Sequence, residues 1–363
     1  MTQSALKEAQ VTTALPRIRA LSTARPDHDI HAAFIAWAED QMDDRRARAL
    51  FRRMAGRSGI DHRFAVLPPT AQGGSPVAPG GFYDGPTPGT AARMALYAEH
   101  APALALKAIA GLDVDLSQVT HLIVASCTGF VAPGVDQIIA RTLNLDPSVE
   151  RLLVGFMGCY AAVSALRSAM HIVRSTPQAK VLVVTVELSC LHLNNTQEIE
   201  PLLAMLQFGD GAAAALVTGE GPGLAVFDPF ATTLPGSADL IRWDIGDTGF
   251  IMHLSGQVPA RIADALQDPA FVHTLAGGDP QAVDAWAVHA GGRSILDAVE
   301  HGLKLDAEAL SASRAVLREG GNMSSSTLMF VLARHMTQKV SRGVALAFGP
   351  GVAAEGFRFR TVE

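Results

Sequence analysis

The chain has 363 residues, of which 48% are hydrophobic and 18% charged, with 33 glycines. This length suits a large globular body, and the composition is typical of a Gly- and Ala-rich α/β enzyme rather than a disordered or fibrous chain. A net charge of −6 leaves no overall basic surface for nucleic acid. The three cysteines, Cys127, Cys159 and Cys190, argue against a disulfide framework and are too dispersed for a zinc site.

No apolar run reaches the roughly 20 residues that a membrane-spanning helix needs. The N-terminal segment MTQSALKEAQVTTALP lacks the basic and then apolar order of a signal peptide. We therefore expect a cytoplasmic protein without a membrane span.

The first third of the chain contains two helical patterns separated by a loop. Residues 30–56 are predicted to form one long amphipathic helix that ends in a basic run. The stretch 65–89 is rich in Pro and Gly, which predicts a loop, and residues 90–111 are predicted to be helical.

After residue 111, short apolar strands alternate with helical segments. The clearest strand patterns are HLIVASC from His121, KVLVVTVEL from Lys180 and GVALAF from Gly343. This alternation predicts layers of helices and sheet, that is, the α/β class.

The two halves of the chain resemble each other at an offset of 163 residues. HLIVASCTGF from His121 falls on DAWAVHAGGR, and LLVGFMGCYAAVSALRSAM falls without a gap on AVLREGGNMSSSTLMFVLA, so Cys159 aligns with Asn322. The identity between the copies is low, and a chance match of α/β periodicity is the alternative. The pattern favours two similar βαβ lobes packed face to face. That packing would bring Cys159 and Asn322 together at two helix starts, with His289 at a neighbouring strand end.

Cys159 lies in GFMGCYAAVSAL, where glycine permits a tight turn from strand to helix. A thiol at a helix N-terminus has its thiolate favoured by the helix dipole, and a nearby histidine favours it further. Most buried cysteines are only small hydrophobic residues, and this interpretation is kept for Cys127 and Cys190, at the ends of apolar strands. The glycine-flanked helix start makes Cys159 the candidate nucleophile.

His289 and Asn322 are the candidate partners of this nucleophile. His289 ends the strand AWAVHAGG, where two glycines allow a ligand to come near, and Asn322 follows two glycines at the start of a small-residue helix. A plain helix cap is the alternative for Asn322. Together, Cys, His and Asn supply a nucleophile, a base and an oxyanion donor, a set suited to thioester chemistry.

Several motifs in the same order resemble the type III polyketide synthases, the chalcone synthase-like family, over residues 10–360. They are GCYAA around Cys159, QFGDGAAAAL, WAVHAGGRSILD around His289, GGNMSSST around Asn322 and AFGPGVAAEG. The chain looks more similar to the bacterial branch, because the plant enzymes have proline where this chain has Ala290.

The resemblance implies an α/β, thiolase-like fold in which two duplicated βαβ lobes form a five-layered αβαβα core. Residues 1–218 would be the N-terminal lobe with Cys159, and residues 219–363 the C-terminal lobe with His289 and Asn322. It also implies a homodimer that acts on acyl-CoA and malonyl-CoA, with no metal and no organic cofactor.

The family's chemistry carries over to the three matching residues. Cys159 would take an acyl group from its CoA ester. His289 and Asn322 would hold the thioester carbonyl of malonyl-CoA and stabilise the enolate that decarboxylation forms. That carbanion would attack the acyl-cysteine and lengthen the chain by two carbons.

The resemblance also implies a gate and a CoA site. Phe208 matches the phenylalanine between the CoA tunnel and the cavity, and Met252 stands at a second gate position that is phenylalanine in chalcone synthase. Arg53 and Arg57 match cations that contact the CoA phosphates. The third such position is Leu50 here, for which Arg48 or Arg52 are candidate replacements.

The cavity positions depart most from chalcone synthase. Ala132 replaces a methionine that reaches across the dimer, His192 replaces a threonine, and Trp243 replaces a glycine. Ser324 matches a cavity serine, and Cys127 is a secondary candidate for the cavity wall. We expect a reshaped cavity that takes an aliphatic starter and gives a pyrone- or resorcinol-type product.

Three other functions remain open at this point. An initiating ketoacyl-ACP synthase shares the Cys, His and Asn set, but the AFGPG loop and the FGDG phenylalanine favour the polyketide synthase. A non-catalytic acyl-CoA-binding protein would be expected to lack one of the three residues. A cysteine hydrolase would need no malonyl gate.

Overall fold

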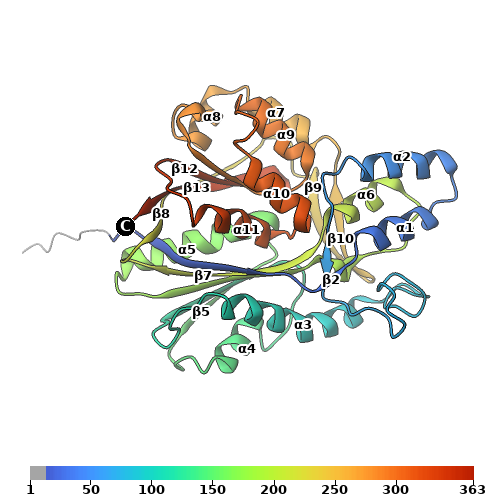
Figure 1. The fold of residues 1–363 in the computed structure, drawn as a ribbon, viewed down its shortest axis with the longest axis horizontal. Helices are drawn as coiled ribbons and strands as arrows, with labels where there is room; N and C mark the ends of the chain where they lie inside the picture. The colour runs from blue at the N-terminus through green and yellow to red at the C-terminus, as the bar shows by residue number, and fades with distance from the viewer. Residues whose placement is uncertain (1–13) are drawn as a thin grey trace, which may run out of the picture.

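A computed structural model describes residues 14–363, whose main sheet is a run of nine hydrogen-bonded strands (Figure 1). The strands follow one another in the order β11-β12-β13-β8-β1-β7-β6-β4-β5. Their bounds are β1 (Arg17–Ala24), β4 (His121–Ser126), β5 (Glu150–Gly155), β6 (Val181–Leu188), β7 (Asp210–Thr218), β8 (Gly223–Thr233), β11 (Ala285–Val288), β12 (Gly343–Gly349) and β13 (Ala353–Val362). Two further pairs of antiparallel strands lie outside this run. One pairs β2 (His28–Asp29) with β3 (Phe64–Ala65), and the other pairs β9 (Ile241–Gly246) with β10 (Gly249–Leu254).

The two halves of the run meet at a short junction. Only two residue pairs, Arg17 with Ala225 and Ile18 with Leu224, join β1 to β8. Because so few bonds hold them in one plane, the halves separate and stack as two sheets, which Figure 1 shows one above the other.

Helices fill three layers around these two sheets (Figure 1). α5 (Ala161–Ser175) and α11 (Ser325–His335) lie between the sheets, α3 (Thr90–Ala110) and α4 (Val135–Thr142) cover the N-terminal half, and four helices cover the C-terminal half. Those four are α7 (Val258–Ala265), α8 (Pro269–Ala276), α9 (Arg293–Gly302) and α10 (Ser311–Gly320). This is the predicted five-layered thiolase-like fold.

The middle layer is the most deeply buried part of the core. Small side chains such as Ala161, Ala162 and Ala165 of α5 pack with Leu328 and Val331 of α11, all of them buried. Small residues let helices and sheets approach closely, so the two helix starts are held at the centre of the molecule.

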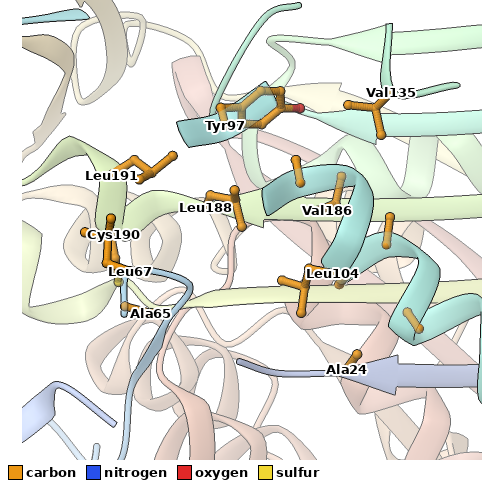
Figure 2. Close-up of a cluster of buried hydrophobic side chains, with 14 of the residues drawn as sticks. Ala24, Ala65, Leu67, Tyr97, Leu104, Val135, Val186, Leu188, Cys190 and Leu191 are labelled. Atoms are coloured by element: carbon orange, nitrogen blue, oxygen red, sulfur yellow. The ribbon is translucent and has the colours of Figure 1, made fainter. Parts of the chain in front are cut away.

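The core beneath α3 is built from larger side chains (Figure 2). Tyr97 and Leu104 of α3 pack over Val186 and Leu188 of β6. Cys190 lies in the same cluster as a free, buried thiol, in line with its interpretation as a small hydrophobic residue.

The topology supports the duplication and also shows where it fails. The offset of 163 places β4 on β11 and β6 on β12, and the two sheets match strand by strand from β1 and β8 outward. The same offset places β5 on residues 313–318, which belong to helix α10. The ungapped alignment was therefore wrong over this segment, because the helix α10 stands in the second half where the edge strand β5 stands in the first. The predicted division of the chain at residue 218 stays a prediction.

The prediction of one helix over residues 30–56 was wrong, because the structure has two. α1 (His31–Gln41) and α2 (Arg45–Ala55) are separated at residues 42–44. Asp44 adopts an extended conformation, and its carboxylate accepts hydrogen bonds from the backbone N–H groups of Arg46 and Ala47. This N-cap starts a new helix and ends the continuity that the apolar pattern suggested.

The loop predicted for residues 65–89 and the helix predicted for 90–111 are confirmed. Within residues 14–363, no helix is long and apolar enough to cross a membrane. The N-terminal segment judged for a signal peptide lies largely outside the described residues, and the cytoplasmic location stays a prediction.

Candidate active site

Cys159 is held in a strained turn between β5 and α5. Phe156 has a φ of 57° and Gly158 a φ of 77°, and a one-turn 3-10 helix, Gly158–Tyr160, leads into α5. A Cβ on Gly158 would lie 2.5 Å from the Pro350 ring, so only glycine fits there. The turn and the AFGPG loop thus fix each other, with Cys159 8% exposed.

Asn322 precedes α11 in the same way that Cys159 precedes α5. Gly321 has a φ of 67°, and the Asn322 side chain is fixed at both ends. Its Oδ1 accepts from the Ser324 N–H at 2.9 Å, and its Nδ2 donates to the Gly291 carbonyl at 3.2 Å. The amide orientation is therefore set, and the second N–H on Nδ2 can reach the Cys159 thiol, with which Asn322 also hydrogen-bonds.

Asn322 is also paired through its backbone with the segment that carries Phe208. The Asn322 N–H donates to the Gln207 carbonyl at 2.8 Å, and the Gly209 N–H donates to the Asn322 carbonyl at 3.0 Å. The candidate gate and the candidate oxyanion donor thus share one short β-bridge.

The structure brings Cys159 together with Asn322, as the duplication predicted. Burial raises the pKa of the Cys159 thiol to about 12, and hydrogen bonds with Ser324 and Asn322 offset this only in part. The expectation of a favoured thiolate therefore does not describe this state. Desolvation outweighs the helix N-terminus, so the resting side chain is a thiol.

His289 is a neutral, unpartnered imidazole. It follows β11, is 1% exposed, and has both ring nitrogens buried without a hydrogen-bond partner among residues 14–363. Burial lowers its pKa to about 3. Gly291 lies against the ring and offers its carbonyl to Asn322, which links the two side chains. Two buried ring nitrogens without a partner are open to hydrogen bonds from a polar ligand that enters the site.

Glu187 is a buried carboxylate that the sequence analysis did not single out. It accepts hydrogen bonds from the backbone N–H of Cys127 at 3.0 Å, from Thr128 Oγ1 at 2.9 Å and from Ser325 Oγ. Burial raises its pKa to about 7, and these hydrogen bonds lower it. Its sequence signal was a lone carboxylate inside the apolar strand KVLVVTVEL.

Cys127 and Ser324 connect this carboxylate to the thiol. Cys127 Sγ lies 3.4 Å from both Glu187 oxygens and 3.2 Å from Ser324 Oγ, and Ser324 in turn reaches Cys159. The two predicted cavity residues Cys127 and Ser324 therefore lie between Glu187 and the nucleophile in one chain of contacts.

Two hollows adjoin helix α6 (Ile199–Gln207) and are lined by different residues of it. A wider cleft of about 830 Å³ is lined by Leu203 and Gln207 of α6 and by Gly291 and Gly292. A smaller cavity of about 290 Å³ is lined by Met205 and by three predicted residues, Phe208, Met252 and Trp243, with His192 beside them. Ala132, in contrast, is exposed between β4 and α4 and does not line this cavity.

Three rings form one fixed wall of the smaller cavity. His192 stacks on Phe250 with 4.3 Å between the ring centroids, and both rings meet Trp243 edge to face. His192 Nε2–H donates to the Thr128 carbonyl at 2.7 Å, and its Nδ1 accepts from the Phe250 N–H at 3.0 Å. Trp243 Nε1–H donates to the Cys127 carbonyl at 2.9 Å. With every polar group paired, the wall is rigid.

Only part of the predicted CoA site lies in the wider cleft. Arg57 lines the cleft, whereas Arg53 is exposed on α2 and is not among the lining residues. Leu50 is also exposed, and both suggested replacements are engaged elsewhere: Arg52 with Glu39, and Arg48 with the Met42 carbonyl.

Arg293 is a cation of this cleft that the sequence analysis missed. It lines the cleft, and its Nη1 donates to the Arg57 carbonyl at 3.3 Å. The available signal was its place directly after Gly291 and Gly292 in HAGGRSILD. Paired glycines before a cation at a helix start leave room for an anionic ligand.

The models of both domains of one enzyme family match this chain. The N-terminal domain of chalcone and stilbene synthases matches residues 4–222, and the C-terminal domain matches residues 225–363. The chain belongs to this family, the type III polyketide synthases. It is therefore a decarboxylating condensing acyltransferase of a family that uses coenzyme A substrates and needs no cofactor.

Curated relatives agree with this assignment. The alpha-pyrone synthesis polyketide synthase-like Pks18 of Mycobacterium tuberculosis is 36% identical over 289 residues, which are 75% of this chain and 73% of that protein. The protein of the same name from Mycobacterium bovis matches equally.

Solved structures of type III polyketide synthases share the fold over nearly the whole chain. PKS-I of the brown alga Ectocarpus siliculosus has a TM-score of 0.86 and 30% identity, covering 96% of this chain and 99% of its own. 1,3,6,8-Tetrahydroxynaphthalene synthase of Streptomyces coelicolor A3(2) has a TM-score of 0.84 and 27% identity, with the same coverage. The predicted family, fold and enzyme class are thus confirmed.

Because His192 is buried as a neutral ring, we predict that the free energy of unfolding depends on pH. Burial lowers the pKa of His192 to about 3, so below pH ~6.5 the unfolded chain binds a proton at this residue that the folded chain does not. The wild type should lose stability relative to His192→Gln by about 1.4 kcal/mol per pH unit between pH ~6 and ~4. Urea unfolding of both proteins across this range measures the difference. The exposed His301→Gln is the control, and a pH-independent difference for His192→Gln would contradict the prediction.

Proposed function

We propose that this type III polyketide synthase loads an acyl-CoA starter on Cys159 and extends it by decarboxylative condensation with malonyl-CoA. The observation that carries the proposal is that Asn322 contacts Cys159 through its side chain and is bridged through its backbone to Phe208, which lines the smaller cavity. A thioester entering through the wider cleft would reach the nucleophile there, and the growing chain would extend into the smaller cavity.

The protonation states of the site suit this chemistry. As the thiol of Cys159 attacks the thioester carbonyl, it must lose its proton, and His289 has a free ring nitrogen to receive it. The C–S bond to CoA then breaks, CoA takes this proton from His289 and leaves as the free thiol, and the acyl-enzyme remains. In the extension step, after Cys159 has become a thioester, the second N–H of Asn322 and the N–H of the neutral His289 ring would hold the enolate oxygen that forms when malonyl-CoA loses carbon dioxide.

We further propose an aliphatic starter and an α-pyrone as the main product, with an alkylresorcinol as the alternative. The cavity is lined by Met205, Met252, Ile251 and aromatic rings, which contact an alkyl chain favourably. Pks18 of Mycobacterium tuberculosis is named for alpha-pyrone synthesis, which supports the same product class here.

The edge strand β5 supports the proposed homodimer. In the part of the chain that the structure describes, β5 pairs only with β4 and ends the nine-stranded run. Its Leu152 and Leu153 are 43% and 46% exposed, and Phe130 nearby is also exposed. An apolar, unpaired edge of this kind is a surface that a second copy would cover.

Single substitutions in the triad should separate acyl loading from decarboxylation. Cys159→Ala should abolish starter loading and all product, yet still release carbon dioxide from malonyl-CoA. Asn322→Ala should lower decarboxylation roughly a hundredfold to a thousandfold, because it removes an oxyanion donor, while Cys159 still accepts an acyl group. His289→Ala should impair both steps.

Labelled carbon dioxide release, beside mass spectrometry of the acylated protein, measures the two steps independently. An Asn322→Ala enzyme that decarboxylates normally but cannot be acylated would reverse the assigned roles and favour a hydrolase-like use of the triad.

The cations of the wider cleft should act on binding more than on turnover. Replacing Arg57 of the cleft together with the neighbouring Arg53, which does not line it, by Ala should raise KM for CoA esters much more than it lowers kcat, because exposed phosphate contacts act in the ground state. Arg293→Ala should likewise raise KM for CoA esters more than it lowers kcat. Arg46→Ala, at the far end of α2, is the matched control. An unchanged KM in both the Arg53/Arg57 double variant and Arg293→Ala would place the phosphate site elsewhere.

The starter range should depend on Trp243. The wild type should prefer medium- or long-chain aliphatic acyl-CoAs over p-coumaroyl-CoA, and Trp243→Ala should shift the preferred chain to greater length because the indole is removed from the cavity wall. Mass spectrometry of products from a ladder of starters measures both. Trp37→Ala on α1 serves as the control. A strong preference of the wild type for the aromatic starter would refute the aliphatic assignment.

A further inference from the structure

Arg63 is a fully buried cation behind the gate segment. Its Nη1 donates to the carbonyls of Met205 at 2.9 Å and Phe208 at 2.6 Å, and its Nε donates to His31 Nδ1 at 3.1 Å. These two carbonyls lie at the C-terminal end of α6, where the helix dipole favours a positive charge. The guanidinium therefore caps the helix that separates the two hollows.

One peptide group connects Arg63 to Asn322. The Phe208 carbonyl accepts from Arg63, and the N–H of the same peptide, that of Gly209, donates to the Asn322 carbonyl at 3.0 Å. Hydrogen bonds at the two ends of one peptide strengthen each other. The position of Asn322 thus depends on the same group that fixes Phe208.

The stem of Arg63 holds the other side of this bridge. A Cβ on Gly321 would lie 3.0 Å from Arg63 Cγ, and one on Gly209 would lie 3.5 Å from Arg63 Cβ. Both glycines therefore leave room for this side chain. The aliphatic carbons pack against the residues on either side of the bridge, so a shift of Arg63 would be transmitted to both strands.

The charge on Arg63 is not neutralised by a contacting carboxylate. Its partners in the described residues are two carbonyls, the His31 ring and the Phe34 ring, 4.4 Å from Cζ, and its Nη2 has no partner. Burial lowers its pKa to about 10, which still leaves a cation at neutral pH. A buried charge without an ion pair is costly, so its retention calls for a role that an apolar residue could not fill.

We propose that Arg63 is a positioning residue for decarboxylation: it fixes Phe208 and Asn322 relative to each other and directs a positive field toward the place where the malonyl enolate forms. This inference rests on the proposed function. Because Phe208 and Asn322 would act on the malonyl group, whereas Cys159 accepts the starter, Arg63 affects extension and not loading.

The test compares Arg63→Met and Arg63→Lys with the wild type on malonyl-CoA alone and on hexanoyl-CoA. In Arg63→Met, kcat for carbon dioxide release should fall about tenfold to a hundredfold, since displacements near 1 Å cost this much, while KM for malonyl-CoA stays nearly constant. Acylation of Cys159 by hexanoyl-CoA, followed by mass spectrometry, should be nearly unchanged. Arg63→Lys keeps the charge and should recover part of the loss.

Arg93→Met is the matched control. Arg93 is equally buried and donates to the carbonyls of Pro88 and Leu193, away from the Phe208 bridge. Its loss should lower the melting temperature without changing the ratio of decarboxylation to acylation. If Arg63→Met does not fold, Arg63→Lys must show the same difference between the two steps, with slower carbon dioxide release and unchanged acylation, at a smaller size.

Two outcomes overturn the inference: normal decarboxylation in Arg63→Met, or an equal loss of loading and decarboxylation, which a merely structural role would produce. A wild type that releases no carbon dioxide from malonyl-CoA would count against the proposed function instead.

Discussion

The close packing of α5 against α11 between two sheets is the constraint on which the site depends. The two helices can lie in one thin layer because their contacting side chains are small, and the polar ones are paired: Ser326 Oγ, for example, donates to Thr185 Oγ1 at 2.9 Å. Each helix begins at a glycine turn that carries a functional side chain. The meeting of Cys159 with Asn322 therefore follows from helix packing in the most rigid part of the core rather than from the arrangement of surface loops.

The same burial determines the resting chemistry of the site. Taking Cys159 and His289 out of water disfavours a thiolate and an imidazolium alike, so both side chains are neutral until a ligand arrives. A neutral thiol is protected from the solvent side reactions that a free thiolate would undergo. The consequence is that the proton must move during acyl transfer, and the unpaired ring nitrogens of the neutral His289 are the acceptor that we propose for it.

The sequence predicted the elements that depend on local patterns and missed those that depend on contacts between distant segments. Glycines beside Cys159 and Asn322 signal helix starts in any context, and the repeat at 163 residues predicted that the two starts meet. The fifth strand had no counterpart in the second half because α10 replaces it, which ungapped periodicity cannot reveal. Glu187 and Arg63 were missed because their roles arise only when β6, α6 and the segment before β3 come together. Arg57 was predicted through a resemblance, whereas Arg293 enters the cleft from a helix in the other half.

Helix α6 links substrate entry, gating and chain growth in a single rigid element. Its Leu203 and Gln207 line the wider cleft, its Met205 lines the cavity, and its last carbonyls are bound by Arg63. Because Gln207 and Gly209 also hold the backbone of Asn322, the gate cannot shift without moving the oxyanion donor. A substitution that widens the cavity at Trp243 or Met252 acts on β9 and β10 instead, outside this bridge. Starter preference can therefore change while the decarboxylation geometry is preserved, which is the physical basis on which one fold can serve enzymes with different products.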